Sequence, residues 1–160
     1  MKVLVFSDSH GKLDWMIAAM ELEKPDHVFF LGDHERDGWD LNKLYPMIPL
    51  NAVKGNCDWG PGLEDWLVEL EGVRFLLTHG HLYGAKTGYS RLEAAGLRTG
   101  ADVVCFGHTH RAIDINEPGR IRLFNPGTIG GPYGQRTTYG VLYVRSGVVT
   151  AEIKDTDTMQ

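Results

Sequence analysis

The stretch that most constrains the fold of this chain is residues 103–110, Val-Val-Cys-Phe-Gly-His-Thr-His. Its first four residues are apolar β-formers, which is typical of a short strand buried on both faces. Gly107 ends this run and allows a tight turn, so that the rings of His108 and His110 can be aimed at one small volume. Because imidazole is the commonest metal ligand in proteins, the stretch predicts a metal site. Taken alone, a surface His-x-His in a loop fits it nearly as well.

The same arrangement, an apolar strand followed by a side chain that can bind metal, recurs four more times upstream. The predicted strands are residues 3–6, 28–31, 51–54 and 73–78, and the donors that follow them are Asp8 and His10, Asp33, Asn56, and His79. Apolar residues at helical spacing over 13–20 separate the first two strands, which predicts a β-α-β unit. If the five strands lie in register in one sheet system, all these donors reach the same edge.

The donor set is too large for a single cation. It comprises two carboxylates, one amide and four imidazoles. One ion would be saturated by about four to six ligands, whereas two ions about 3.5–4 Å apart would use the whole set. Two cations that close need a shared anion, so one carboxylate is expected to bridge them.

The rest of the pattern is that of an α/β chain with many tight turns. The length favours one domain, residues 1–160. Residues 34–37 are expected to be a solvated loop, in which Arg36 is a candidate for holding a phosphate oxygen. The further expected elements are a short helix around 40–45, a strand over 67–71 paired with 73–78, a helix from Ser90 to Gly100, strands over 112–115 and 121–124, and a hairpin of 139–145 with 148–153.

Composition and net charge argue against some classes of function and against some cellular locations. The formal net charge of −5 argues against general nucleic-acid binding, which needs a basic face, although two divalent cations would nearly cancel it. The two cysteines fit no disulfide or Cys-x-x-Cys pattern, so a reducing cytoplasm is the expected location. No apolar stretch of 18 residues and no leader are recognised, so no membrane association is expected.

Five short motifs follow one another in a recognisable order. They are Asp8-x-His10, Gly32-Asp33, Gly55-Asn56, His79 and Gly107-His108-x-His110. Each is weak evidence alone, but in this order and spacing the chain resembles the calcineurin-like metallophosphoesterases, and looks closest to their small single-domain phosphodiesterase branch. The resemblance spans residues 1 to about 145 and includes the turn at 125–128. It implies an α/β (α+β) fold of four layers, with two mixed β-sheets packed face to face and flanked by helices.

The resemblance also implies a ligand set and a reaction. It assigns Asp8, His10, Asp33 and His110 to one ion, and Asp33, Asn56, His79 and His108 to the other, with Asp33 as the bridge. The implied cofactors are two divalent transition-metal ions, with Mn²⁺ expected and Ni²⁺, Fe²⁺, Zn²⁺ or Co²⁺ as alternatives. The implied reaction is hydrolysis of a small phosphodiester by in-line attack of a metal-bridging hydroxide.

One position departs from the family pattern. Members that act on phosphomonoesters carry a histidine directly after the motif asparagine, and here that residue is Cys57. A thiol is a poor general acid, so substrates with good leaving groups are expected to suffer least. His81, two residues past His79, is the candidate to replace it as acid or phosphate contact, and the alternative is a histidine that only hydrogen-bonds a metal ligand.

Other interpretations stay open at this point. A non-catalytic protein-interaction scaffold on the same fold, as in the retromer subunit of the superfamily, is the main alternative, and a nuclease is a narrower one. The intact donor set favours the enzyme. His27 is expected to be exposed, and His34 to lie behind the ligands or in solvent. A homo-oligomer could use the apolar residues Trp59, Tyr133 and Tyr139 as interface.

Overall fold

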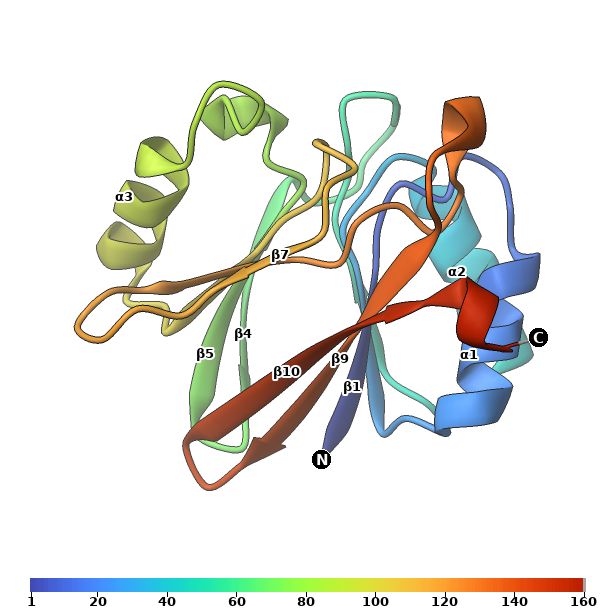
Figure 1. The fold of residues 1–160 in the computed structure, drawn as a ribbon, viewed down its shortest axis with the longest axis horizontal. Coiled ribbons are helices and arrows are strands. Elements are labelled where there is room, and N and C mark those ends of the chain that lie inside the picture. Colours follow the sequence, from blue (N-terminus) through green and yellow to red (C-terminus); the bar gives the residue numbers. More distant parts are fainter. Residues whose placement is uncertain (160) are drawn as a thin grey trace.

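The computed structural model describes residues 1–159, and within them the chain forms two five-stranded sheets and three α-helices (Figure 1). The helices are α1 (Asp14–Glu23), α2 (Glu35–Leu44) and α3 (Ser90–Thr99). The strands are β1 (Lys2–Phe6), β2 (His27–Phe30), β3 (Leu50–Ala52), β4 (Asp65–Leu70), β5 (Val73–Thr78), β6 (Val103–Cys105), β7 (Ile113–Ile115), β8 (Arg122–Asn125), β9 (Thr138–Arg145) and β10 (Val148–Asp155).

Both sheets combine parallel and antiparallel pairs. The first sheet has the order β10-β9-β1-β2-β3, in which β1, β2 and β3 run parallel and the last hairpin is antiparallel to β1. The second has the order β4-β5-β6-β8-β7, in which β5, β6 and β8 are parallel and the two edge strands antiparallel. The mixed sheets implied by the family resemblance are therefore confirmed.

The space between the sheets is filled by alternate residues of the central strands. Val3 and Val5 of the first sheet belong to the same buried cluster as Val103 and Cys105 of the second. Across this layer the Phe29 and Phe75 rings meet edge to face, with centroids 5.3 Å apart. In β9 a Cβ at Gly140 would lie 2.5 Å from Cε1 of Phe124, so the close packing of the sheets requires glycine there.

The intervening residues of the same strands face outward and are covered by helices. Leu4 and Phe6 pack with Met16 and Met20 of α1, and Val104 packs with Leu92 of α3. Figure 1 shows α1 and α2 on the outer side of the first sheet and α3 on the outer side of the second. The order of layers is thus helix, sheet, sheet, helix, which confirms the predicted fold class.

Several local predictions were wrong. Helix α2 begins at Glu35 instead of near residue 40, and Asp37 in its first turn is buried. His27 is 8% exposed because its Nε2 hydrogen-bonds Oδ1 of Asn51 at 2.5 Å. Tyr139 is fully buried, whereas Trp59 and Tyr133 are more than 90% exposed. Of these three predicted interface residues, Tyr139 is therefore ruled out.

The buried carboxylate of Glu23, the last residue of α1, joins this helix to β1, β9 and β10. Glu23 accepts hydrogen bonds from the Tyr139 hydroxyl at 2.9 Å and from Lys154 Nζ at 2.7 Å, and Lys2 Nζ lies 3.2 Å away. Burial alone would raise the pKa of Glu23, but these three hydrogen bonds lower it.

Among residues 1–159, none of the helices has the length and apolar character that a membrane span needs.

We expect Glu23→Gln to lower the free energy of unfolding at pH 7 by about 1–3 kcal/mol, because two cations lose a buried partner. The folded-state pKa of Glu23 is lowered, so its charge stabilises the fold above the unfolded-state pKa, and this stabilisation is lost as pH falls through the folded value. In urea titrations, the gap between wild type and variant should therefore shrink below about pH 4.

The matched control is Glu152→Gln, since this exposed carboxylate lies 3.9 Å from the same Lys154. Its effect should stay under about 0.5 kcal/mol at every pH. A Glu23→Gln effect of the same size at pH 3 and pH 7 would contradict the assigned role of the charge.

Candidate metal centre

The predicted donors lie in loops that directly follow parallel strands. Asp8 follows β1, Asp33 follows β2, His79 follows β5, and His108 and His110 follow β6. The two sheets meet at these loops, because the His108 N–H donates to Oδ2 of Asp8 at 3.1 Å. A Cβ at Gly107 would lie 2.0 Å from Oγ of Ser7, so only glycine allows this approach.

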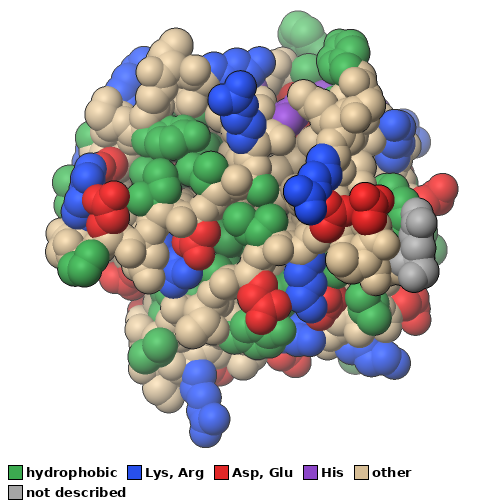
Figure 2. Space-filling model, in the orientation of Figure 1, with side chains coloured by type: hydrophobic (Ala, Val, Ile, Leu, Met, Phe, Trp, Pro, Cys, Tyr) green, Lys and Arg blue, Asp and Glu red, His purple; other side chains and the backbone are tan. Residues whose placement is uncertain are grey.

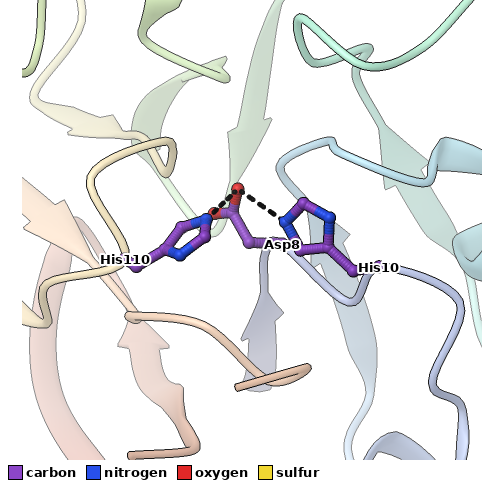
Figure 3. Close-up of side chains that lie close together, drawn as sticks. All are labelled: Asp8, His10 and His110. Carbon is purple, nitrogen blue, oxygen red and sulfur yellow. Dashed lines mark ion pairs between the residues drawn. The ribbon is translucent and has the colours of Figure 1, made fainter. Parts of the chain in front are cut away.

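Asp8 stands between two imidazoles that come from different sheets (Figure 3). Nε2 of His110 lies 3.3 Å from Oδ1 of Asp8, and Nε2 of His10 lies 4.0 Å from the same oxygen. One donor atom from each of these three residues falls within 4.8 Å of the others, which is close enough for a shared metal ion.

Asp33 joins this group to a second one. Its Oδ2 lies 3.9 Å from Nε2 of His10, and its Oδ1 lies 3.4 Å from Nε2 of His79. Nε2 of His79 is also 3.7 Å from Oδ1 of Asp8. Asp8, Asp33 and His79 form the second set whose donor atoms lie within 4.8 Å of one another. The two carboxylate oxygens of Asp33 thus face different imidazoles.

Three of the donor atoms are buried without a hydrogen-bond partner. They are Oδ1 of Asp8, Nε2 of His10 and Nε2 of His79. A buried polar atom without a partner costs about 1–3 kcal/mol, and these three face one another. A transition-metal cation satisfies carboxylate oxygen and imidazole nitrogen together, so this donor set fits a metal ion.

The opposite atoms of the same side chains are held by hydrogen bonds. Nδ1 of His79 donates to the Leu31 carbonyl at 2.7 Å, and Nδ1 of His110 donates to Oε1 of Gln135 at 2.6 Å. Each bond fixes the tautomer that leaves Nε2 free to bind a cation. Oδ2 of Asp8 likewise accepts from the Ser7 hydroxyl at 2.6 Å, which leaves Oδ1 free.

The backbone of the donors is strained. Asp8, His10, Asp33, His108 and His110 all have φ between 48° and 70°, in the left-handed region that non-glycine residues rarely adopt. Such residues each cost about 1–3 kcal/mol, and they persist where the surrounding structure fixes them, typically at functional sites.

The pKa values follow from two carboxylates and several imidazoles sharing a small volume. Burial alone would raise the pKa of Asp33, but the His79 imidazole 3.4 Å away and its charge lower it well below its usual range. Burial would lower the pKa of His79, but Asp33 and Asp8 raise it. Burial and the charge of His79 lower the pKa of His108 to about 4. The carboxylates therefore stabilise positive charge at the centre.

Two further predicted ligands lie beside this group. The His108 ring packs edge to face on the His79 ring, with centroids 5.1 Å apart. Asn56 follows β3 and is exposed, and its Nδ2 lies 3.6 Å from Sγ of Cys57. The Cys57 N–H donates to Oδ1 of Asp33 at 3.0 Å, so this loop touches the centre through its backbone.

His81 also lies next to the centre. Its ring centroid is 5.4 Å from that of His79 and 6.1 Å from that of His108. Its Nδ1 is buried without a hydrogen-bond partner. Burial and the charge of His79 lower its pKa, so the ring is neutral at pH 7. Burial and the charge of Asp33 raise the pKa of the Cys57 thiol.

Some residues that position the donors were missed by sequence reasoning. Oδ2 of Asp37 accepts from the Ser9 hydroxyl and the Gly11 N–H, both at 2.7 Å, and so fixes the loop that carries His10. Gln135 orients His110 from a loop 25 residues away, and no local sequence pattern predicts a hydrogen bond between residues so far apart. The Thr128 hydroxyl donates to the Asp8 carbonyl at 2.7 Å, and its turn was the one signal available, as part of the family resemblance.

Comparisons with known proteins agree with this architecture. The chain is 36% identical over 160 residues to the probable metallophosphoesterase YsnB of Bacillus subtilis, covering 97% of this chain and 91% of YsnB. It is 38% identical over 168 residues to the phosphodiesterase YfcE of Escherichia coli, covering 89% and 87%. The structure of Vps29 from Entamoeba histolytica complexed with Zn²⁺ has the same fold, with a TM-score of 0.77, 20% identity, and coverage of 98% and 99%.

A family model for the calcineurin-like phosphoesterase superfamily domain matches residues 1–147, which is most of the chain. Together with two relatives above 30% identity, this match confirms the resemblance inferred from the five motifs. The chain belongs to the calcineurin-like phosphoesterase superfamily.

Proposed function

We propose that this protein is a binuclear metal-dependent phosphodiesterase that hydrolyses a small phosphodiester. The observation that carries the proposal is the group of three buried, unpartnered donor atoms on Asp8, His10 and His79. Nε2 of His10 and Nε2 of His79 lie 4.0 Å and 3.7 Å from Oδ1 of Asp8 without a hydrogen bond to it, so a shared cation would satisfy all three atoms. The relatives named phosphodiesterase and metallophosphoesterase support the same activity.

The proposed ligand set follows the two groups of the centre. Asp8, His10 and His110 would hold one ion, and His79, His108 and Asn56 the other, with Asp33 as the ligand that both ions share. Two divalent ions there, with Mn²⁺ as our choice, would lower the pKa of a water for in-line attack and neutralise charge on the phosphate. The absence of thiolate among these ligands is compatible with Mn²⁺.

The chain's own residues prepare this site before substrate arrives. The Cys57 N–H and the Leu31 carbonyl hold Asp33 and His79 in place, so the donors need not reorganise during the reaction. His81 is neutral, and a nearby cation would lower its pKa further. We propose that it contacts a phosphate oxygen as a hydrogen-bond donor and does not protonate the leaving group.

The alternative function is a protein-interaction scaffold on the same fold. A scaffold needs no strained backbone at its donors and no unpartnered polar atoms beneath its surface. The centre has both, with five donors at positive φ. These costs to stability favour an enzyme over a scaffold.

The first prediction of this proposed function concerns Asp33, the proposed bridging carboxylate. Asp33→Asn should lower kcat/KM for bis(p-nitrophenyl) phosphate on the order of a thousandfold with Mn²⁺ present, because the charge shared by both ions is lost. The assay measures p-nitrophenolate release by wild type and variant, and EDTA should abolish the wild-type rate. The control is Asp40→Asn, a partly exposed carboxylate on α2, which should leave the rate unchanged.

The scaffold would be favoured by a different result. If the wild type releases no p-nitrophenolate with Mn²⁺, Ni²⁺, Fe²⁺, Zn²⁺ or Co²⁺, the proposed enzyme is wrong.

The second prediction separates two roles for His81. His81→Ala should lower kcat/KM by about 10- to 100-fold, and equally for the p-nitrophenyl and phenyl esters of thymidine 5′-phosphate, because a phosphate contact acts on both. His81→Asn should restore part of the rate, since its amide can still donate a hydrogen bond. A loss much larger for the phenyl ester, the poorer leaving group, would identify His81 as the general acid and contradict this role.

A further inference from the structure

A cavity of about 350 Å³ lies beside the loop that carries His108 and His110. Its lining residues are Ala85, Lys86, Tyr89, Thr109 and Arg111. Thr109 stands between His108 and His110 in the chain, so the cavity adjoins the candidate metal centre. The charge of Lys86 also reaches the His108 ring, where it is the third cause of the lowered pKa, after burial and the charge of His79.

Two cations line this cavity without an acidic partner. Within the described residues, neither Lys86 nor Arg111 has a carboxylate oxygen within 4.0 Å, a property that several other Lys and Arg residues of the chain share. Both side chains are exposed and belong to a chain with a net charge of −5. In the view of Figure 2, basic and acidic side chains are interspersed over the surface. The cavity is thus lined by positive charge, although the protein as a whole is acidic.

The backbone that carries these two residues is well fixed. Lys86 follows Ala85, which is 3% exposed and packs in the cluster under α3. The Arg111 N–H donates to the Thr109 hydroxyl at 3.1 Å, and that hydroxyl accepts from Nδ2 of Asn125 at 3.1 Å. The ring of Tyr89 is held against Phe106, with centroids 5.3 Å apart. Little ordering of the backbone would be needed when a ligand binds.

The charge of the two cations indicates what the cavity would bind. Two positive charges match a group with two negative charges, and a phosphate monoester at pH 7 has nearly two. A carboxylate would use only one.

We propose that this cavity binds a second phosphate of the substrate. The substrate would then be a phosphodiester in which one alcohol arm carries a phosphate monoester, held by Lys86 and Arg111 while the diester lies at the metal centre. This inference rests on the proposed phosphodiesterase activity and names a substrate class for it.

The test compares two substrates that differ in one group. They are the p-nitrophenyl ester of thymidine 5′-phosphate and the same ester with an added 3′-phosphate. Wild type should prefer the second by about tenfold or more in kcat/KM, because charge-assisted hydrogen bonds to the added phosphate are gained. In the double variant Lys86→Ala/Arg111→Ala this preference should fall to about one.

The matched control is Arg145→Ala, which removes one exposed cation at the other end of the first sheet. Arg145 closes β9, whose pairing with β1 places it beyond the amino end of β1, away from Asp8. This variant should keep the full preference. Raising the salt concentration should reduce the preference of the wild type and leave the double variant unaffected.

A binding measurement keeps the inference testable without turnover. Calorimetric titration of EDTA-treated protein with thymidine 3′,5′-bisphosphate and with thymidine 5′-phosphate should give a Kd about fivefold lower or more for the bisphosphate. The double variant should bind both alike, and its circular dichroism should match that of the wild type.

The results separate a failure of the second-phosphate site from a failure of the proposed phosphodiesterase activity. If the wild type hydrolyses both esters with equal kcat/KM, or if the double variant keeps the preference, the second-phosphate site is wrong and the phosphodiesterase stands. If neither ester is hydrolysed, the proposed function fails, and equal binding of the two nucleotides by the metal-free wild type then overturns the cavity's role as well.

Discussion

The structure depends on keeping two carboxylates, Asp8 and Asp33, buried within one cluster of imidazoles. Neither side chain is more than 4% exposed. Two negative charges at such a place are unfavourable unless positive charge accompanies them. The raised pKa values of His79 and His110 supply part of that charge in the protein alone. A pair of divalent cations would supply it fully, and would also occupy the unpartnered donor atoms.

The rest of the fold can be understood as the means of bringing these groups together. Alternate residues of the central strands fill the layer between the sheets, so both sheets are fixed face to face. The loops after β1 and β6 can then meet, provided that Gly107 allows the approach to Ser7. The resulting backbone strain at Asp8 and His108 is offset by burial elsewhere in the three apolar clusters.

The central strands and the donors could be predicted because each follows from a short, local sequence pattern. Continuous short runs of apolar, β-forming residues predicted the strands, and the donors were found by their place after those runs. The burial of Asp37 and His27 could not be found in this way, because their hydrogen-bond partners are distant in the chain. Asp37 accepts from Ser9 and Gly11, and His27 pairs with Asn51. The start of α2 at Glu35 was missed for a similar reason. Its first N–H groups are capped by Asp58, 23 and 24 residues away, and not by a neighbouring side chain.

A binuclear centre requires that the donors hold two cations at once, and the metal stoichiometry of the purified protein measures this number. The protein would be stripped with EDTA, incubated with excess Mn²⁺, dialysed, and measured by elemental analysis. Two manganese ions per chain is the predicted result. One ion or none per chain, with the same outcome for nickel, iron, zinc and cobalt, would contradict a binuclear centre.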